Sequence, residues 1–295
     1  MRYRAKKSLG QNFLKSRAVL AKIVEAGEIS AEDTILEIGP GKGALTEKLL
    51  ECAGKVVAVE KDPDLCAYLK EKFAAEISTR KLELAQGDIL DFEMPDLRGQ
   101  TSQVRRGSKV APFSRGYKIV ANIPYNITGA ILKKFLTAET DGEKEKRHRK
   151  KGGAELPRGG QPERMVLLVQ KEVAKRIMAR DGKESLLSLS VKAYGSPKIV
   201  IKVPAGNFSP VPKVDSAALV IKNISKKIFT ENNIEEGLFW QTVRAGFAHK
   251  RKKLSGNLPK LREFPGNLGI LSKLGDKRAE DLSLSDWILL AKAGI

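Results

Sequence analysis

A glycine-rich stretch, Glu37-Ile-Gly39-Pro-Gly41-Lys-Gly43, ends a compact apolar run and leads into a helical pattern. Glycines without a Cβ allow the backbone to turn sharply and to approach a ligand closely. The helix that follows exposes free N–H groups at its amino terminus. With Ala44, the stretch also satisfies the dinucleotide pattern Gly-x-Gly-x-x-Ala. The glycine loop therefore predicts a ligand site, and NAD stays open as its ligand at this step.

Two acids follow the next two apolar runs along the chain. Glu60 ends the run Val56–Glu60, and Asp88 comes just after the run Leu82–Gln86. A carboxylate at the position of Glu60 can accept hydrogen bonds from both ribose hydroxyls of an adenosyl group, and Asp88 can accept a hydrogen bond from the adenine amine. A surface acid and a turn cap are the plainer interpretations. NAD and S-adenosylmethionine share this ribose, so the acids do not separate the two cofactors.

The tetrapeptide Asn122-Ile123-Pro124-Tyr125 directly follows a further apolar run, Lys118–Ala121. The exocyclic amine of adenine is a poor nucleophile because its lone pair is delocalised into the ring. The Asn122 amide oxygen and the Ile123 carbonyl can accept its two N–H hydrogens and favour a pyramidal, more reactive nitrogen. Pro124 stiffens the loop and lacks a competing N–H, and Tyr125 can stack on the base. A plain Asn-Pro turn is the alternative, but after a glycine loop and two strand-end acids we favour methyl transfer to an adenine amine, helped chiefly by positioning.

The chain resembles the ribosomal RNA adenine dimethyltransferases, specifically the small-subunit (KsgA) family. The motifs that carry the resemblance follow one another in order along nearly the whole chain, at Lys7–Leu14, Gln170–Ile177, Phe208–Ser216, Phe247–Leu254 and Arg278–Leu282. The resemblance implies S-adenosyl-L-methionine as cofactor. It also implies dimethylation at N6 of two adjacent adenines in a 16S rRNA loop, within a small ribosomal subunit particle, during ribosome biogenesis.

The same resemblance implies roles for individual residues. The implied cofactor contacts, together with Gly41 as the second glycine of the loop, are Asn12, Leu14, Gly39, Glu60, Asp88 and Asn122. Base handling would fall to Asn122, Tyr125 and Phe208, the last as the second face of an aromatic sandwich around a flipped base. A core aromatic beside two prolines is the plainer interpretation of Phe208.

The periodicity of apolar residues predicts the elements that position these residues. We expect buried strands at 34–38, 56–60, 82–86, 118–121 and 165–170, alternating with helices, and a later antiparallel pair at 198–203 and 214–222. Such alternation predicts a Rossmann-like α/β fold with a mostly parallel sheet, whose carboxyl strand ends bind ligands. After residue 226 only helical spacing appears, so we expect a methyltransferase domain at 1–226 and a small all-helical, RNA- or ribosome-binding domain at 227–295.

Composition and charge narrow the partners. The chain has 295 residues, of which 41% are hydrophobic, so it can bury a core. Its formal net charge of +19 favours a polyanion such as nucleic acid. The acid-free tract Lys250, Arg251, Lys252 and Lys253 is suited to gripping RNA phosphates without reading sequence. Two basic insertions, at 99–116 and 138–162, read equally well as solvated loops and as phosphate contacts.

The few cysteines and histidines predict no metal site. Cys52 and Cys66 form no Cys-x-x-Cys pair, and both histidines lie in Lys/Arg runs. We expect a reduced, cytoplasmic monomer with no membrane span. Two alternatives stay open beside a small-subunit enzyme: a large-subunit rRNA methyltransferase of the erythromycin-resistance type, and a ribosome-assembly binder whose catalysis is secondary.

Overall fold

The computed structural model describes residues 5–6, 9–92, 116–138, 160–258 and 273–295. Nearly all of the two basic insertions expected at 99–116 and 138–162 lies outside these residues. By their contacts, the residues form two compact units: the first is 1–171 with 198–224, and the second is 172–197 with 225–295. We describe the two units separately.

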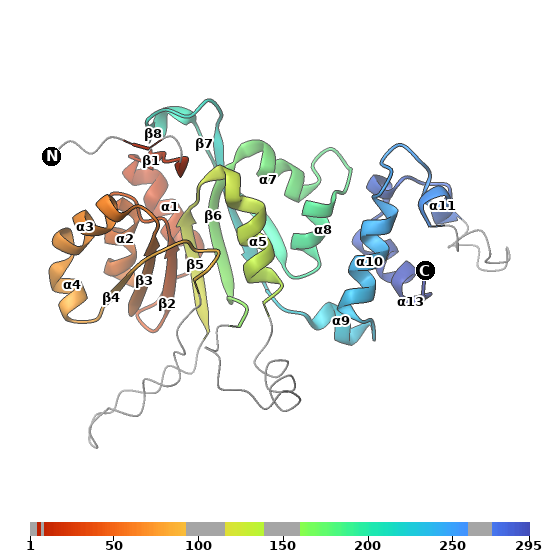
Figure 1. Ribbon diagram of the computed structural model, residues 1–295, viewed down its shortest axis with the longest axis horizontal. Coiled ribbons are helices and arrows are strands. Elements are labelled where there is room, and N and C mark those ends of the chain that lie inside the picture. The colour runs from red at the N-terminus through yellow and green to blue at the C-terminus, as the bar shows by residue number, and fades with distance from the viewer. Residues whose placement is uncertain (1–4, 7–8, 93–115, 139–159, 259–272) are drawn as a thin grey trace, which may run out of the picture. The chain divides into compact units, whose positions relative to one another are not determined.

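The first unit is built on a seven-stranded sheet (Figure 1). Its strands are β2 (Thr34–Ile38), β3 (Lys55–Glu60), β4 (Leu82–Gln86), β5 (Tyr117–Asn122), β6 (Arg164–Gln170), β7 (Ser196–Val203) and β9 (Ser216–Lys222). They lie in the order β4-β3-β2-β5-β6-β9-β7. The first five strands pair in parallel, and β9 pairs antiparallel with β6. This arrangement confirms the predicted mostly parallel, Rossmann-like sheet.

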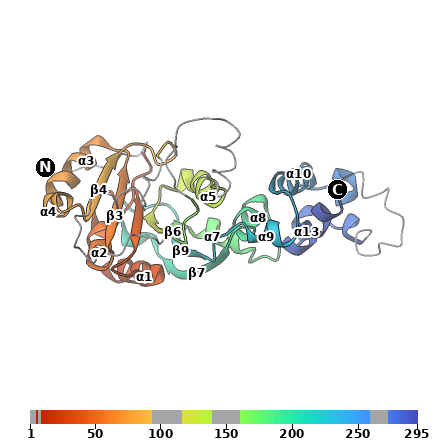
Figure 2. The ribbon, with the colours of Figure 1, turned by 90° about the horizontal axis from the view of Figure 1, so that it is seen from below.

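Helices cover the sheet on both faces, which explains why its central strands are almost completely buried. They are α1 (Arg17–Gly27), α2 (Ala44–Cys52), α3 (Pro63–Lys72), α4 (Ala74–Ser78) and α5 (Thr128–Leu136). Figure 2 shows α1 and α2 on one side of the sheet and α5 on the other. Every residue of β2 and β3 is buried, as expected of strands packed between two helical layers.

Two helices of this unit begin at caps that the sequence carries. Ser16 accepts a hydrogen bond from the Val19 N–H and caps α1. Asp62 accepts from the Asp64 N–H and caps α3, with Pro63 in the first turn. These side chains satisfy N–H groups that a helix leaves without internal partners. They also fix where the chain turns from the end of β3 into α3.

A short ladder joins the beginning of the chain to a segment far along it. β1 (Phe13–Leu14) pairs antiparallel with β8 (Phe208–Ser209), so that Leu14 lies opposite Phe208. The Lys15 N–H then donates to the Asn207 carbonyl at 2.8 Å. Neither strand was predicted, because two residues are too few to produce a periodic pattern. The ladder places the residues that precede β1 at the carboxyl edge of the sheet.

The second unit is helical. Its helices are α7 (Lys171–Met178), α8 (Leu186–Lys192), α9 (Lys227–Glu231), α10 (Glu236–Gly246), α11 (Leu254–Asn257) and α13 (Leu284–Lys292). An aromatic cluster forms part of its core, with Tyr194 stacked on Trp240 and Phe229 edge-on to both Tyr194 and Phe239. Residues 172–197 had been expected to belong with the sheet, whereas they group with this unit.

Within the residues described, no helix is both long and apolar enough to cross a bilayer.

Candidate active site

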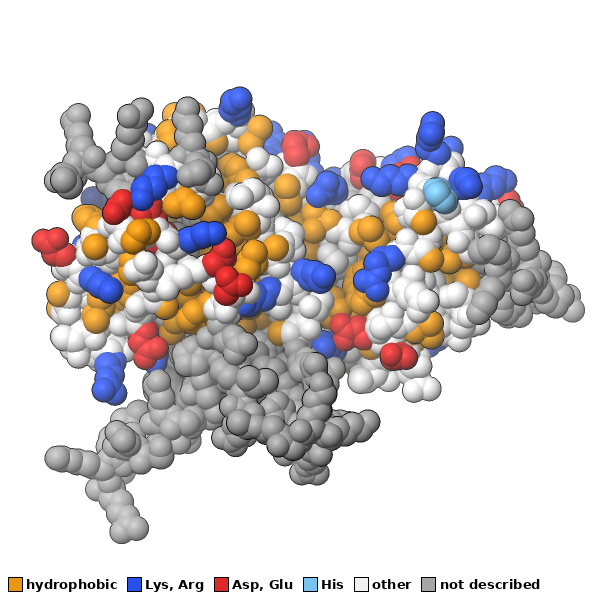
Figure 3. Space-filling view, viewed as in Figure 1, with side chains coloured by type: hydrophobic (Ala, Val, Ile, Leu, Met, Phe, Trp, Pro, Cys, Tyr) orange, Lys and Arg blue, Asp and Glu red, His pale blue; other side chains and the backbone are white. Residues whose placement is uncertain are grey.

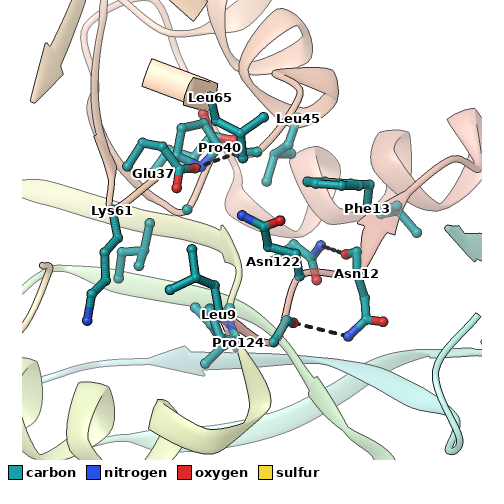
Figure 4. Close-up of a pocket in the computed structure, with 18 of the residues that line it drawn as sticks. Leu9, Asn12, Phe13, Glu37, Pro40, Leu45, Lys61, Leu65, Asn122 and Pro124 are labelled. Atoms are coloured by element: carbon teal, nitrogen blue, oxygen red, sulfur yellow. Dashed lines mark hydrogen bonds between the residues drawn. The ribbon is translucent and has the colours of Figure 1, made fainter. Parts of the chain in front are cut away.

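A cavity of about 420 Å³ opens at the carboxyl ends of the parallel strands. It is bounded by residues that follow β2, β3, β4 and β5, and by an N-terminal segment, residues 9–15 (Figure 4). Nine of the predicted site residues line it: Asn12, Leu14, Gly39, Gly41, Glu60, Asp88, Asn122, Pro124 and Tyr125. Positions spread over more than a hundred residues of sequence therefore surround one space, which is the size expected of a small-molecule site.

The three loop glycines share a backbone conformation, and two of them differ in what a side chain would meet. All have positive φ, at +64° for Gly39, +60° for Gly41 and +77° for Gly43. A Cβ on Gly43 would lie 2.5 Å from the Phe73 ring, whereas one on Gly39 would meet no atom within 4 Å. Gly43 therefore allows close packing of α2 against α3, while Gly39 leaves open space beside the cavity, where a bound group can approach the backbone.

Glu60 ties the glycine loop to the end of β3. Its carboxylate accepts hydrogen bonds from the Gly41 N–H at 3.0 Å and from the Asp62 N–H at 2.9 Å. The residue is 5% exposed, and burial raises the pKa of the Glu60 carboxyl even though the two N–H groups act in the opposite direction. Two carboxylate oxygens have more acceptor capacity than two N–H groups use, so Glu60 can also receive hydroxyl donors from a ligand in the cavity.

Asp88 lies on the same wall with a charged partner. Its carboxylate accepts from Lys61 Nζ at 2.8 Å and from the Leu90 N–H at 2.9 Å. The Lys61 ammonium holds the pKa of the Asp88 carboxyl below its usual range, so this acceptor is ionised at neutral pH. Both side chains line the cavity, and Asp88 remains able to accept a further N–H.

Glu37 is a cavity residue to which sequence reasoning assigned no role. It is 1% exposed at the end of β2 and accepts a hydrogen bond from Thr46 Oγ1 at 2.7 Å. Burial raises the pKa of Glu37 to about 8, and the neighbouring Glu60 adds to that effect. The sequence did carry a signal, because an acid inside a fully buried strand needs an explanation.

Asn122 is oriented by the N-terminal segment. Its amide Nδ2 donates to the main-chain carbonyl of Asn12 at 2.9 Å, and the Asn12 side chain in turn donates to the Gly10 carbonyl at 3.1 Å. Figure 4 shows the two asparagines facing each other across this bond. Because the nitrogen end of the Asn122 amide is committed to Asn12, its oxygen end is left as the acceptor. Asn12 thus contributes a carbonyl, a contact that the sequence did not predict.

Tyr125 closes the same wall from the start of a 3-10 turn, Tyr125–Ile127. Its ring is half-buried, and its hydroxyl lies 2.7 Å from Ser216 Oγ at the start of β9. Burial raises the pKa of the Tyr125 phenol, so the hydroxyl is neutral over the physiological range. Pro124 precedes it on the cavity wall.

Ion pairs hold the chain just before the N-terminal segment onto the first turn of α3. Lys6 Nζ lies 2.8 Å from Asp62 Oδ1 and 2.7 Å from Asp64 Oδ2. Gln11 Nε2 donates to the other oxygen of Asp62 at 3.0 Å. Bonds to the two aspartates raise the pKa of Lys6, which is therefore charged throughout the physiological range. Neither aspartate was expected to take part in the site.

Phe208 does not reach the cavity. It is 0% exposed and packs in the hydrophobic core with residues that include Leu14, Val203 and Val220. The next residue, Ser209, lines the cavity instead. In the ladder with β1, Phe208 lies opposite Leu14, and both residues belong to the hydrophobic core. In this structure the Phe208 ring lies in the core and does not line the cavity, so its role as the second face of a base sandwich stays a prediction.

The tract Lys250, Arg251, Lys252 and Lys253 lies between α10 and α11 in the second unit, and all four residues are exposed. Lys253 pairs with Asp276 at 2.9 Å between Nζ and Oδ1. Figure 3 shows Lys and Arg side chains gathered around a histidine on this unit. An exposed basic tract of this kind suits phosphate contacts.

The chain is similar to known proteins along nearly its whole length. Residues 2–292 match the family model described as ribosomal RNA adenine dimethylase. The chain is 38% identical to the ribosomal RNA small subunit methyltransferase A of Dehalococcoides mccartyi, over 97% of this chain and 87% of that protein. It is 37% identical to the protein of the same name from Thermosynechococcus vestitus, over 98% and 96% of the two chains.

Solved structures show the same fold. A dimethyladenosine transferase from Plasmodium falciparum superposes with a TM-score of 0.68 at 26% identity, over 94% of this chain and 96% of that one. The 23S rRNA methyltransferase ErmE superposes with a TM-score of 0.69 at 24% identity, over 96% and 99% of the two chains, which speaks for the fold alone. With the family model matched from end to end, this chain belongs to the ribosomal RNA adenine dimethylase family.

Proposed function

We propose that this chain is a 16S rRNA (adenine-N6,N6)-dimethyltransferase that uses S-adenosyl-L-methionine to methylate two adjacent adenines in a small-subunit rRNA loop. One observation carries the proposal: the Asn122 amide nitrogen is bound to the Asn12 carbonyl, so its oxygen is presented as an acceptor beside the cavity. An acceptor fixed in this way suits an amine that must be activated without a strong base.

The cavity fits the adenosyl cofactor by its donors and acceptors. Glu60 offers carboxylate oxygens for ribose hydroxyls, and Asp88 offers an ionised acceptor for the adenine amine. Gly39 leaves open space at the backbone where a side chain would intrude. When bound, the cofactor supplies a methyl group on a positively charged sulfonium. The protein's part is to hold both reactants in line and to exclude water.

The residues of the Asn122–Tyr125 loop act on the adenine. The Asn122 oxygen and the Ile123 carbonyl accept the two N–H hydrogens of the amine, which favours a pyramidal nitrogen with an available lone pair. The amine becomes strongly acidic only after the new N–C bond forms, so the two neutral oxygens need only accept hydrogen bonds from its N–H groups, and the proton that is released passes to solvent water. Tyr125 stacks on the base and limits its rotation.

The second unit would contribute the grip on RNA. Four consecutive exposed cations, Lys250–Lys253, bind phosphates without sequence preference, and a folded rRNA is then selected by shape and by exposed loop bases. We further propose that the enzyme works as a monomer in the cytoplasm, on a small-subunit particle during ribosome biogenesis. For the regions at 99–116 and 138–162, phosphate contacts and solvated loops without a role stay equal alternatives.

The test is transfer of tritiated methyl groups from S-adenosylmethionine. Unmethylated 30S particles should be labelled at two adjacent adenines, whereas naked 23S RNA should not. Labelling of 23S RNA alone would replace this proposal with the large-subunit alternative. The variant Asn122→Ala should lose methylation and keep particle binding. Calorimetry should show binding of S-adenosylhomocysteine and none of NADH, and the reverse would restore the dinucleotide alternative.

A further inference from the structure

The hydrogen bond between Tyr125 and Ser216 joins two segments that carry different parts of the site. Tyr125 belongs to the loop after β5, and Ser216 is the first residue of β9. Their hydroxyl oxygens lie 2.7 Å apart, and either one can donate. Ser216 is 0% exposed, so water does not compete for its Oγ. A bond of this kind is stronger in effect than the same bond at a wet surface.

Ser216 itself is held rigidly from both sides. It lies opposite Gln170 in the β6–β9 ladder. Its neighbour Asp215 accepts the Lys171 N–H on its carbonyl at 2.9 Å and the Ala205 N–H on its carboxylate at 3.1 Å. The Ser216 hydroxyl is therefore a fixed point on the sheet.

The Tyr125 ring has no comparable anchor on its own segment. Its backbone is held by Thr128 Oγ1, which donates to the Tyr125 carbonyl at 3.1 Å. That bond fixes the main chain and does not itself constrain rotation about the side-chain torsions. The bond to Ser216 removes this freedom, because a tyrosine held at its hydroxyl can no longer turn its ring away from the cavity.

We propose that Ser216 is a positioning residue for methyl transfer: its hydroxyl fixes the Tyr125 ring at the angle needed to stack on the target adenine. The proposal rests on the proposed function, since it assigns Tyr125 to the base. Ser216 does not line the cavity, so it acts only through Tyr125. Its loss should lower kcat, which depends on the alignment of the base, and leave cofactor binding unchanged.

The test is a double-mutant cycle with Tyr125→Phe and Ser216→Ala, measured as methylation of unmethylated 30S particles. Each single variant should lower kcat roughly 3- to 10-fold, as expected for one neutral hydrogen bond of about 1 kcal/mol. The double variant should be no slower than the slower single variant, because both remove the same bond. S-adenosylhomocysteine affinity should stay within about twofold of the wild type, whereas Ser216→Thr should keep much of kcat because it retains the hydroxyl.

Matched controls are Tyr68→Phe, at an exposed tyrosine, and Ser190→Ala, at a serine whose hydroxyl donates to the Leu187 carbonyl and which does not line the cavity. Losses of kcat that multiply in the double variant, or a Ser216→Ala enzyme with wild-type kcat, would overturn the proposal. So would a fall in S-adenosylhomocysteine affinity parallel to the fall in kcat. A wild-type protein that methylates no particle would refute the proposed function instead, so the two failures are distinguishable.

Discussion

Replacing Asn122 by aspartate separates two explanations of the site. Asn122→Asp keeps the size of the side chain and adds an oxygen acceptor. If acceptor capacity alone mattered, the variant would stay active. In the structure, however, the amide nitrogen lies 2.9 Å from the Asn12 carbonyl oxygen. An ionised carboxylate would place a second oxygen there with no hydrogen between the two, so we expect the N-terminal segment to lose its hold on the catalytic loop.

The size of the loss follows from this one contact. Leaving a partly buried carbonyl without its donor costs about 1–3 kcal/mol, which corresponds to roughly 5- to 150-fold in kcat. Because Asn12 also lines the cavity, S-adenosylhomocysteine affinity should fall as well. Asn122→Ala should lose more activity, since it removes the acceptor together with the donor.

The pH dependence of Asn122→Asp gives a second readout. A carboxyl facing a carbonyl oxygen has its pKa raised, because the charged form is disfavoured there. Below that pKa its O–H can again donate to the Asn12 carbonyl. The ratio of variant to wild-type activity should therefore rise as the pH falls from about 8 to about 6.

The assay is methylation of unmethylated particles across that pH range, with calorimetric binding of S-adenosylhomocysteine. Asn232→Asp is a matched control, because the Asn232 amide donates to the Ile228 carbonyl at 2.8 Å in a partly buried place outside the cavity. Full activity of Asn122→Asp at pH 8, or a ratio that rises with pH, would refute the assignment of the amide orientation.

Three further predictions concern stability, the glycine loop and RNA binding. In Glu37, burial raises the pKa from 4.5 to about 8, so the folded state holds a proton that the unfolded chain releases and stability falls with rising pH between these values. The free energy of unfolding of Glu37→Gln, relative to that of the wild type, should therefore rise by up to about 1.4 kcal/mol for each pH unit in that window. Urea unfolding curves that give the same difference at every pH would contradict this. Gly43→Ala should lose roughly 2–5 kcal/mol through left-handed strain and contact with Phe73. Compared with Gly43→Ala, Gly39→Ala should lose less stability but more cofactor affinity. Thermal melts measure the loss of stability, and calorimetry measures the loss of affinity. Replacing Lys250–Lys253 by alanine should weaken particle binding and reduce the slope of log affinity against log salt concentration by roughly 3. The affinity for S-adenosylhomocysteine should stay unchanged as a control, and an unchanged slope would contradict the prediction.

The sheet and most of the cavity could be predicted because their signals are local. Each parallel strand is a short apolar run, and a chemically distinctive residue such as Glu60 or Asn122 stands at its carboxyl end. Parallel strands bring those ends to one edge whatever their separation in sequence. The pattern therefore located the site without any knowledge of the pairing register.

The features that were missed depend on long-range register. Phe208 lies in the core and pairs with Leu14 in a two-residue ladder, and no periodicity reveals so short a pairing. The bond from Asn122 to the Asn12 carbonyl involves a backbone atom, which every residue possesses, so residue type could not indicate it. Glu37 was visible as an acid in an apolar run, but its meaning depends on how completely the strand is buried.

The order of the two units along the chain has a consequence for synthesis. Residues 172–197 are translated before the rest of the unit to which they belong, because 198–224 come next and complete the sheet. Until the later residues are translated, the Tyr194 ring lacks its contact with Phe229, and the Tyr194 carbonyl lacks its donor, the Ser225 N–H. The Glu184 N–H likewise lacks its acceptor, the carbonyl of Glu280. In a nascent chain, residues 172–197 therefore lack these ring and hydrogen-bond partners until translation is nearly finished. Ending the chain at residue 226 would leave that segment exposed permanently, so the two units cannot be separated by a single cut.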